Sequence, residues 1–314
     1  MLAMNTATKY AITKKTKNTA TTVFLYAFLG LLVWVIIFPF ITKISQSFMS
    51  FEDMFDLSVI LIPKHPTLDN YKMFIGSAGY YAGVGGSLLV SSIAAVTQTF
   101  VCAMTGYALA KLRGKAAGIV MFIVVLSILV PPQVITVPLF LRFRFFDILG
   151  IFTLITGDSL NLINSIAPIT ILSVTGFGLK NGLFIFVMRQ FFKGVPEELE
   201  EASLIDGYGI FPTYLRIILP ISAPMLVTLF ILAFCWQWTD TFYSSVFFSD
   251  FPVLARSTFT FLQSRMGGNL YSSRYLQNVL LHTGVILAIL PIIALFIVMQ
   301  KKLVTGIERS GIVG

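Results

Sequence analysis

The chain has 314 residues, of which 56% are hydrophobic and only 11% are charged, and its formal net charge is +8. A soluble domain carries roughly 25% charged residues, so this composition excludes a soluble enzyme, a disordered regulator and a disulfide-rich secreted domain. The mean hydropathy of +0.87 and the long uncharged runs instead predict an all-α polytopic membrane protein.

Uncharged runs long enough to cross a bilayer, about 20 residues each, occur six times along the chain. The first run is too long for the core of a signal peptide, so we expect it to be retained as a membrane helix. The second exceeds one span and begins with five glycines, so its helix is expected only near its second half. The six predicted spans are Thr21–Thr42, Gly86–Ala110, Ala116–Leu141, Ser159–Leu179 (resuming after Lys180 as far as Met188), Ile217–Thr239 and Tyr275–Gln300.

Basic residues predict the orientation of these spans, because loops on the cytoplasmic side are enriched in Lys and Arg. With both termini in the cytoplasm, the inner segments hold 13 basic residues and the outer segments hold eight. The predicted organisation is a basic N-terminal segment (1–20), a transmembrane domain (21–305) containing a cytoplasmic loop (193–216), and a cytoplasmic tail (306–314). Because membrane anchoring accounts for the positive charge, nothing indicates nucleic-acid binding.

The loop before the fifth span carries the most specific pattern in the chain. Five of the 14 acidic residues lie within ten positions of it, at Glu197, Glu198, Glu200, Glu201 and Asp206. Pro196 suits the first turn of a helix, and Gly207 suits its end, where the backbone turns left-handed. Leu199, Ala202 and Ile205 form an apolar stripe every three residues. This predicts a helix–turn–helix on the cytoplasmic face; a solvated acidic connector is the alternative.

The segment EEASLIDGYGIFPTYLRIILP resembles the EAA loop of permease subunits in binding-protein-dependent ABC importers. It supplies Glu201, Ala202, then Ser203 in place of the second Ala, Gly207 at the expected spacing, and Pro220 in the Ile-Leu-Pro ending. Four other segments resemble the oligosaccharide branch with the maltose-type second permease: PKHPTLDNYKMF, GYALAKLRGK, FCWQWTDTF (with Thr239 replacing an Asn) and LPIIALFIVMQKKLVTGI. The stretch from Gly150 to Phe192 is longer than this resemblance leads us to expect, so the fourth span should be broken or preceded by an extra helix.

The resemblance implies the fold of an ABC type I importer permease in the bacterial plasma (inner) membrane. It also implies a carbohydrate uptake system in which this chain forms half of the pathway, with a homologous second permease, two ABC ATPase subunits and an extracytoplasmic sugar-binding protein as partners. ATP and Mg would bind the ATPase subunits and no cofactor would bind this chain. The residues that would couple to the ATPase are Glu197, Glu198, Leu199, Glu201, Ala202, Ser203, Asp206, Gly207 and Pro220.

The substrate pathway is predicted from polar and aromatic residues in apolar surroundings. Asp240 follows the fifth span, and ionisable groups in membrane segments usually face a cavity or a partner. Trp236 and Trp238 are two positions apart, so they point to different faces, and aromatic rings can stack on sugars. Lys180 interrupts the fourth span. The alternatives are an aromatic belt with Asp240 at the water boundary, and Lys180 reaching to the interface.

Two other functions are considered. An ion-gradient-driven secondary transporter of a small polar solute predicts inverted repeats and several intramembrane carboxylates, whereas only Asp240 is a candidate here. A membrane enzyme needs a catalytic constellation, and the sequence contains neither H-E-x-x-H nor a nucleophile elbow beside its two histidines, His65 and His282. Cys102 and Cys235 lie in apolar runs and indicate packing. We therefore expect no catalytic residues and no metal site.

Overall fold

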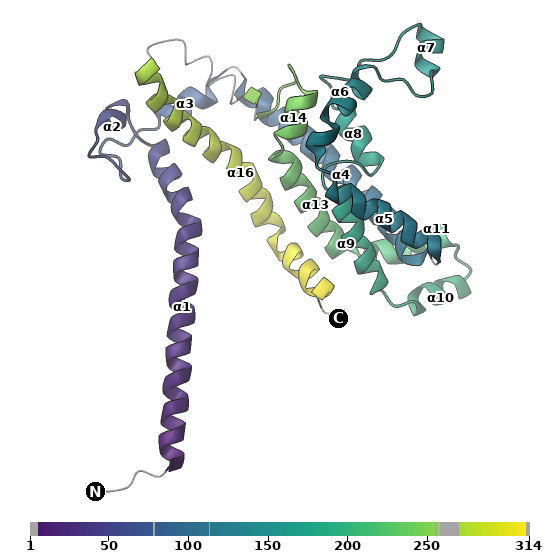
Figure 1. Cartoon of the computed structure of the whole chain (residues 1–314), viewed down its shortest axis with the longest axis horizontal. Coiled ribbons are helices and arrows are strands. Elements are labelled where there is room, and N and C mark those ends of the chain that lie inside the picture. The colour runs from purple at the N-terminus through teal and green to yellow at the C-terminus, as the bar shows by residue number, and fades with distance from the viewer. Residues whose placement is uncertain (1–5, 78, 113, 255, 258–269, 312–314) are drawn as a thin grey trace. The chain divides into compact units, whose positions relative to one another are not determined.

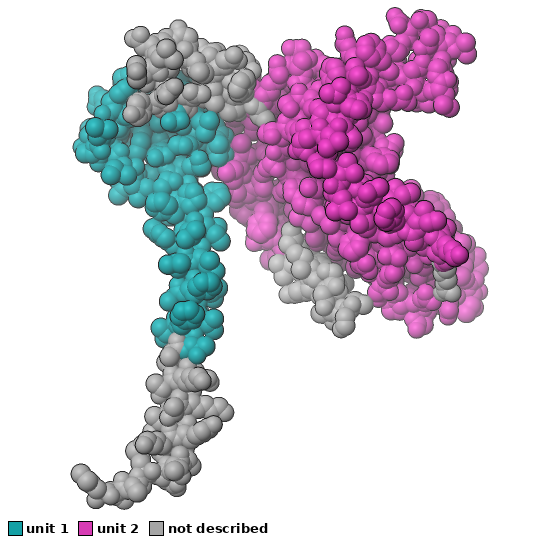
Figure 2. Space-filling view, viewed as in Figure 1, with its two compact units in different colours: residues 1–74, 265–287 teal, residues 75–264, 288–314 magenta. Residues whose placement is uncertain are grey.

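The computed structural model describes residues 6–311 except positions 78, 113, 255 and 258–269. Across these residues the chain is helical and forms no β-sheet; one isolated antiparallel bridge joins Phe146 and Leu160. The helices group into two compact units, one of residues 1–74 and 265–287 and the other of residues 75–264 and 288–314 (Figure 1, Figure 2). The all-α class predicted from the composition is confirmed.

The first unit contains α1 (Thr6–Ser47), α2 (Phe51–Phe55), α3 (Asp69–Ile75) and the first half of α16 (Leu270–Gly311). The buried Asn70 amide ties α3 to the end of α1, because its Nδ2 donates to the carbonyls of Ser47 at 3.0 Å and Met49 at 2.9 Å. The membrane stretch of α1 is different: its residues from Thr21 to Ile41 are all exposed. This helix therefore needs lipid or another subunit to cover its apolar side chains.

The second unit is built around α4 (Tyr80–Lys111), which packs against α8, α9 and α13. Its other helices, with the rest of α16, are α5 (Lys115–Leu129), α6 (Thr136–Arg144), α7 (Ile151–Thr156), α8 (Ala167–Val174), α9 (Asn181–Lys193), α10 (Glu198–Ile205), α11 (Ile210–Thr213), α12 (Leu219–Ile221), α13 (Ala223–Trp238) and α14 (Phe242–Phe247). A 3₁₀ turn, η1 (Pro132–Ile135), precedes α6, and a π turn, η2 (Tyr214–Ile218), follows α11.

Glycines let α4 approach its neighbours closely. A Cβ on Gly106 would lie 2.6 Å from Cβ of Met188 on α9, so only a residue without a side chain fits there. A Cβ on Gly86 would collide with the carbonyl oxygen of Pro252. The predicted start of this helix near Gly86 was too late, because α4 begins at Tyr80, although Gly76 and Gly79 lie before it as expected. Gly83 and Gly86 lie inside α4, where an added Cβ would meet Leu254 and Pro252, so these two serve close packing.

By length and composition, three single helical stretches in the described part of the chain can cross a membrane: Thr21–Ser47, Tyr80–Lys111 and Asn278–Lys301. Two further spans are bent pairs, Lys115–Leu129 with Pro132–Arg144 at 91°, and Ile210–Ile221 with Ala223–Trp238 at 77°. Prolines at both bends remove backbone N–H donors and interrupt the helices. The fifth predicted span thus bends near Pro220 and Pro224, and the expectation of an uninterrupted third span was wrong.

The predicted fourth span is divided between α8 and α9. Gly176 at φ 82° and Lys180 at φ 64° turn the chain between the two helices, and the buried Asn181 side chain donates to the Ser173 carbonyl at 3.0 Å. The additional helix α7 precedes this pair, so both expectations for the long 150–192 segment are met. The predicted domain boundaries at residues 20 and 305 fall inside α1 and α16 and stay predictions.

Candidate functional site

The predicted helix–turn–helix is formed by α10 and α11. Helix α10 begins at Glu198, just after Pro196, and carries three carboxylates in its first turn, where the helix dipole favours negative charge. At its other end the N–H of Tyr208 donates to the Ser203 carbonyl at 3.0 Å and that of Gly207 donates to the Leu204 carbonyl at 3.1 Å. These two bonds are a Schellman motif, and they need the left-handed φ of 85° at Gly207.

The two faces of α10 have different surroundings. The predicted apolar stripe of Leu199, Ala202 and Ile205 faces outward, and Ile205 is 86% exposed. The coupling candidates Glu197, Glu198, Glu201, Asp206 and Gly207 are likewise exposed. Among the residues predicted to couple to the ATPase, Ser203 alone is buried, with 1% exposure. An exposed apolar stripe on a short helix is the expected form of a surface that a partner covers.

The turn after α10 is held by polar contacts inside this unit. Ser203 Oγ lies 2.8 Å from Oγ1 of Thr213 on α11, and that hydroxyl donates to the carbonyl of Gly209. The Arg216 guanidinium lies 5.5 Å from the centre of the Tyr208 ring, a cation–π contact. Beyond this turn Ile210 and Phe211 are again exposed, and Pro220 lies exposed in α12.

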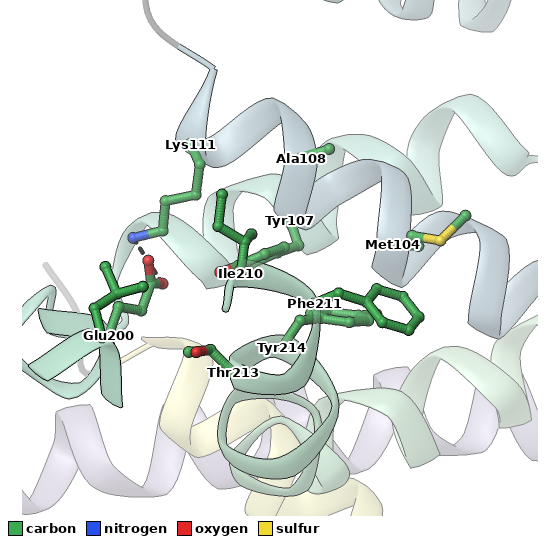
Figure 3. Close-up of a pocket in the computed structure, with 10 residues that line it drawn as sticks. Met104, Tyr107, Ala108, Lys111, Glu200, Ile210, Phe211, Thr213 and Tyr214 are labelled. Atoms are coloured by element: carbon green, nitrogen blue, oxygen red, sulfur yellow. Dashed lines mark ion pairs between the residues drawn. The ribbon is translucent and has the colours of Figure 1, made fainter. Parts of the chain in front are cut away.

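The inner side of the loop meets the C-terminal end of α4 (Figure 3). Lys111 Nζ lies 2.9 Å from Glu200 Oε1, and both side chains are mostly buried, at 28% and 17% exposure. The Tyr107 and Tyr214 rings pack with centroids 4.9 Å apart. A cavity of about 460 Å³ lies between these contacts, and its lining residues are Met104, Tyr107, Ala108, Lys111, Glu200, Leu204, Ile210, Phe211, Thr213 and Tyr214.

Sequence reasoning missed the ion pair and the Ser203–Thr213 contact. Lys111 and Tyr107 both lie in the GYALAKLRGK segment that carried the family resemblance. The segment therefore marked these residues as characteristic of the family, but it did not indicate what they contact. Glu200 was recognised as one acid of a cluster, but the one-dimensional pattern does not distinguish it from the exposed Glu201 beside it. In space Glu200 faces α4 (Figure 3).

Two of the four predicted pathway residues lie together. Lys180 caps the start of α9 and places its Nζ 5.8 Å from the centre of the Trp236 ring. Trp236 in turn stacks on Phe184, with centroids 5.3 Å apart. This leaves an exposed ammonium beside a half-buried aromatic face, where the fourth predicted span is interrupted.

The other two pathway residues are engaged elsewhere. Trp238 points to a different side of α13, as predicted, and its Nε1 donates to the Ala288 carbonyl of α16 at 3.0 Å. The Asp240 carboxylate accepts bonds from the backbone N–H groups of Tyr243 at 3.3 Å and Ser244 at 3.0 Å, which caps the start of α14. Each residue therefore has a structural role that accounts for its position.

Comparison with known proteins identifies the family. Residues 102–309 match the model for "Binding-protein-dependent transport system inner membrane component". A probable starch degradation products transport system permease protein, AmyC of Thermoanaerobacterium thermosulfurigenes, is 28% identical over 92% of this chain and 96% of its own length. The alpha-glucoside transport system permease protein AglG of Rhizobium meliloti is 31% identical over 80% of this chain and 62% of its own length. The arabinooligosaccharides transport system permease protein AraQ of Halalkalibacterium halodurans is 26% identical over 90% of this chain and 93% of its own length.

A solved structure shares the fold. A chain of a bacterial ABC transporter for import of the acidic polysaccharide alginate matches 91% of this chain with a TM-score of 0.67 at 18% identity. The match covers 97% of that chain. None of these matches supports the alternative of a secondary transporter driven by an ion gradient. The described helices, the family model and the relatives together show that this multi-pass chain belongs to the binding-protein-dependent ABC transport permeases, the non-catalytic inner membrane components of such systems.

Proposed function

We propose that this permease imports an oligosaccharide and is driven by ATP hydrolysis on partner subunits. The relatives named for starch degradation products, alpha-glucosides and arabinooligosaccharides support the substrate class. The chain contains no G-x-x-x-x-G-K-[ST] motif, so ATP and Mg belong on separate ATPase subunits. A homologous second permease, two ATPase subunits and an extracytoplasmic sugar-binding protein complete the proposed system.

One observation carries the coupling part of this proposal. Helix α10 is eight residues long and exposes Ile205 almost fully, while Gly207 ends it sharply. A large apolar side chain on a short polar loop is stabilised when a partner removes it from water, by about 25 cal/mol per Å² of apolar area. In the proposed mechanism α10 sits against an ATPase subunit, and closure of the ATPase pair moves it. Glu197, Glu198, Leu199, Glu201, Ala202 and Asp206 form the rest of that contact, Ser203 and Gly207 set its shape, and Pro220 joins it to the fifth span.

The pathway proposal centres on Lys180 and Trp236. The Trp236 ring offers a face on which the C–H groups of a sugar ring can stack, and the Lys180 ammonium beside it can donate to hydroxyl or acidic oxygens. Trp238 and Asp240 act as supports, because their polar atoms are already bonded to Ala288 and to the start of α14.

The proposed orientation has both termini and α10 in the cytoplasm and residues 45–72 outside. Cysteine labelling with a membrane-impermeant reagent tests it. In intact cells a cysteine at Asp69 should react and a cysteine at Glu198 should not. Labelling of position 198 from outside would overturn the topology.

Purification and photo-crosslinking test the function. The chain should purify with a second permease and two ATPase subunits, and a photoreactive residue at Ile205 should crosslink to an ATPase subunit. The same group at Leu149, which is 95% exposed before α7, is the matched control and should not. The purified complex in proteoliposomes should then take up members of a labelled oligosaccharide panel only with Mg-ATP inside and the binding protein outside. Saturable uptake by this chain alone, without ATP, would contradict the proposal.

A further inference from the structure

We propose that Lys111 and Glu200 are positioning residues that join α10 to the end of α4, so that the two helices move as one body during transport. The inference rests on the proposed function, in which an ATPase subunit moves α10. It goes further by naming the route by which that movement enters the membrane helices of this chain.

The geometry of the ion pair favours a specific link. The 2.9 Å separation is that of a close ion pair, although Glu200 Oε1 has no aligned hydrogen-bond partner among the described residues. The partial burial of both side chains reduces screening of the pair by solvent. Lys111 is the last residue of α4 and Glu200 lies in the first turn of α10. The negative end of one helix dipole favours the ammonium and the positive end of the other favours the carboxylate. Each charge is therefore stabilised by its own helix as well as by its partner.

A cavity beside the ion pair leaves little side-chain packing between α10 and the end of α4. About 460 Å³ of open space separates α10 and α11 from the last turns of α4, whereas interiors that transmit movement by packing are filled. Figure 3 shows Lys111 and Glu200 bridging this space at one side, with Tyr107 and Tyr214 in contact elsewhere. Without Lys111, only the polar interaction of Tyr107 with Glu200 would join the two helices across this side of the cavity, so α10 would follow α4 less closely.

Helix α4 is the element that can carry the movement onward. It packs against α8, α9 and α13, and Gly106 places it against the backbone of α9. Arg189 of α9 donates from Nε to the Leu109 carbonyl at 3.2 Å, two residues before Lys111. A displacement of the end of α4 is therefore shared with α9 directly.

The test measures a distance in the assembled complex. Spin labels at Glu198→Cys on α10 and Leu112→Cys at the end of α4, in a Cys102→Ala, Cys235→Ala background, report how the helices move relative to each other. In the otherwise unmodified complex the distance distribution should be narrow and equal without nucleotide and with Mg-ATP plus vanadate. Lys111→Met and Glu200→Gln should each broaden it and should lower the ATP-dependent movement of α4 against α5.

Controls separate the ion pair from general effects. Lys115→Met removes a nearby exposed basic charge, and Lys111→Arg keeps the charge of the pair; both variants should leave the distribution narrow. If Lys111→Met and Glu200→Gln keep the narrow distribution in both states, the inference is wrong. If Lys111→Met and Glu200→Gln do not assemble, Lys111→Arg, which keeps both charges in place, should still assemble, and its failure would also overturn the inference. Crosslinking of Ile205 to the ATPase in the same samples reports on the proposed function separately.

Discussion

Ser203 Oγ lies 2.8 Å from Thr213 Oγ1, which links the coupling helix to α11 across the turn at Gly207. The EAA-loop resemblance has Ala at position 203, and on that ground alone a Ser203→Ala change would be expected to be nearly silent. Because the Thr213 hydroxyl donates to the Gly209 carbonyl, Ser203 must be the donor to Thr213, and both hydroxyls are buried. The substitution that departs from the family pattern therefore adds a contact.

Ser203→Ala is accordingly expected to lower the stability of the permease by about 1 kcal/mol, the usual net value of one hydrogen bond. Thr213→Val should cost more, because it leaves the buried Ser203 hydroxyl and the Gly209 carbonyl without that partner. Thermal unfolding of the detergent-purified complex measures both, and the double variant should be less destabilised than the sum. Ser245→Ala, whose exposed hydroxyl bonds only within its own helix, is the control and should leave the melting temperature unchanged.

Gly207→Val is expected to uncouple transport from ATP hydrolysis while the complex still assembles. A Cβ at Gly207 meets no atom within 4 Å, so the whole effect comes from the left-handed backbone, which costs an L-residue roughly 1–2 kcal/mol and a β-branched one more. Gly209→Ala is the matched control, because Gly209 has φ −80° and an added Cβ makes only an ordinary contact with Pro212. The measurement is the number of sugar molecules taken up per ATP hydrolysed in proteoliposomes, which should fall in Gly207→Val and stay unchanged in Gly209→Ala. A wild-type rate of uptake in Gly207→Val would mean that this turn does not set the coupling helix.

Gly106→Val should prevent stable packing of α4 on α9, since its Cβ would lie 2.6 Å from Met188 Cβ and 3.0 Å from the Arg189 backbone nitrogen. Overpacking of this kind typically costs about 1–3 kcal/mol. The measurement is the yield of folded, monodisperse permease and its melting temperature. Gly118→Ala on α5, where an added Cβ meets nothing, should be neutral or slightly stabilising. Equal melting temperatures for Gly106→Val and the wild type would show that α4 and α9 are farther apart.

The segment of residues 50–67 should loosen in acid through Asp53. Burial raises the pKa of this carboxyl, but hydrogen bonds from the backbone and ring of His65 outweigh it and hold the pKa below its ordinary value of 3.8. A lowered pKa stabilises the fold above pH 3.8, and this stabilisation is lost as the pH falls through the lower folded-state value. Hydrogen exchange at the His65 amide, corrected for the intrinsic effect of pH, should therefore accelerate only in that acid range. In Asp53→Asn the acid-specific acceleration should disappear; its persistence would assign the loosening to another group.

Most of the fold class and the limits of the coupling helix could be predicted from sequence, because both depend on local signals. Composition indicates membrane helices, and Pro196 and Gly207 mark the ends of α10 within two residues. The 91° bend before α6 was missed although Pro131 and Pro132 stand in the sequence, because hydropathy alone treats the run as one span. The glycines at the start of α4 were misread because their partner, Pro252, is far away along the chain.

In the candidate sites, too, features set by local sequence could be predicted, whereas contacts between distant segments could not. The apolar stripe of α10 could be predicted because Leu199, Ala202 and Ile205 recur every three residues, a spacing that the sequence displays directly. The choice of Glu200 rather than Glu201 as the partner of Lys111 depends on how two distant helices meet, and no local pattern encodes it. Likewise, the sequence placed the interruption of the fourth span at Lys180, but the meeting of Lys180 with Trp236 depends on how α9 and α13 pack, which no local pattern encodes.

The uniformly exposed apolar stretch of α1 has a consequence for biosynthesis. The side chains from Thr21 to Ile41 are all exposed within their own unit, so partition of this helix into the bilayer does not require packing against the other helices of that unit. Insertion can therefore be complete while later helices are still being synthesised, and association with other subunits becomes a second, separate step of the kind described for membrane helices. Changes that keep α1 apolar should leave insertion intact and alter only that second step, so the helix can adapt to a new partner without endangering the fold of its own chain.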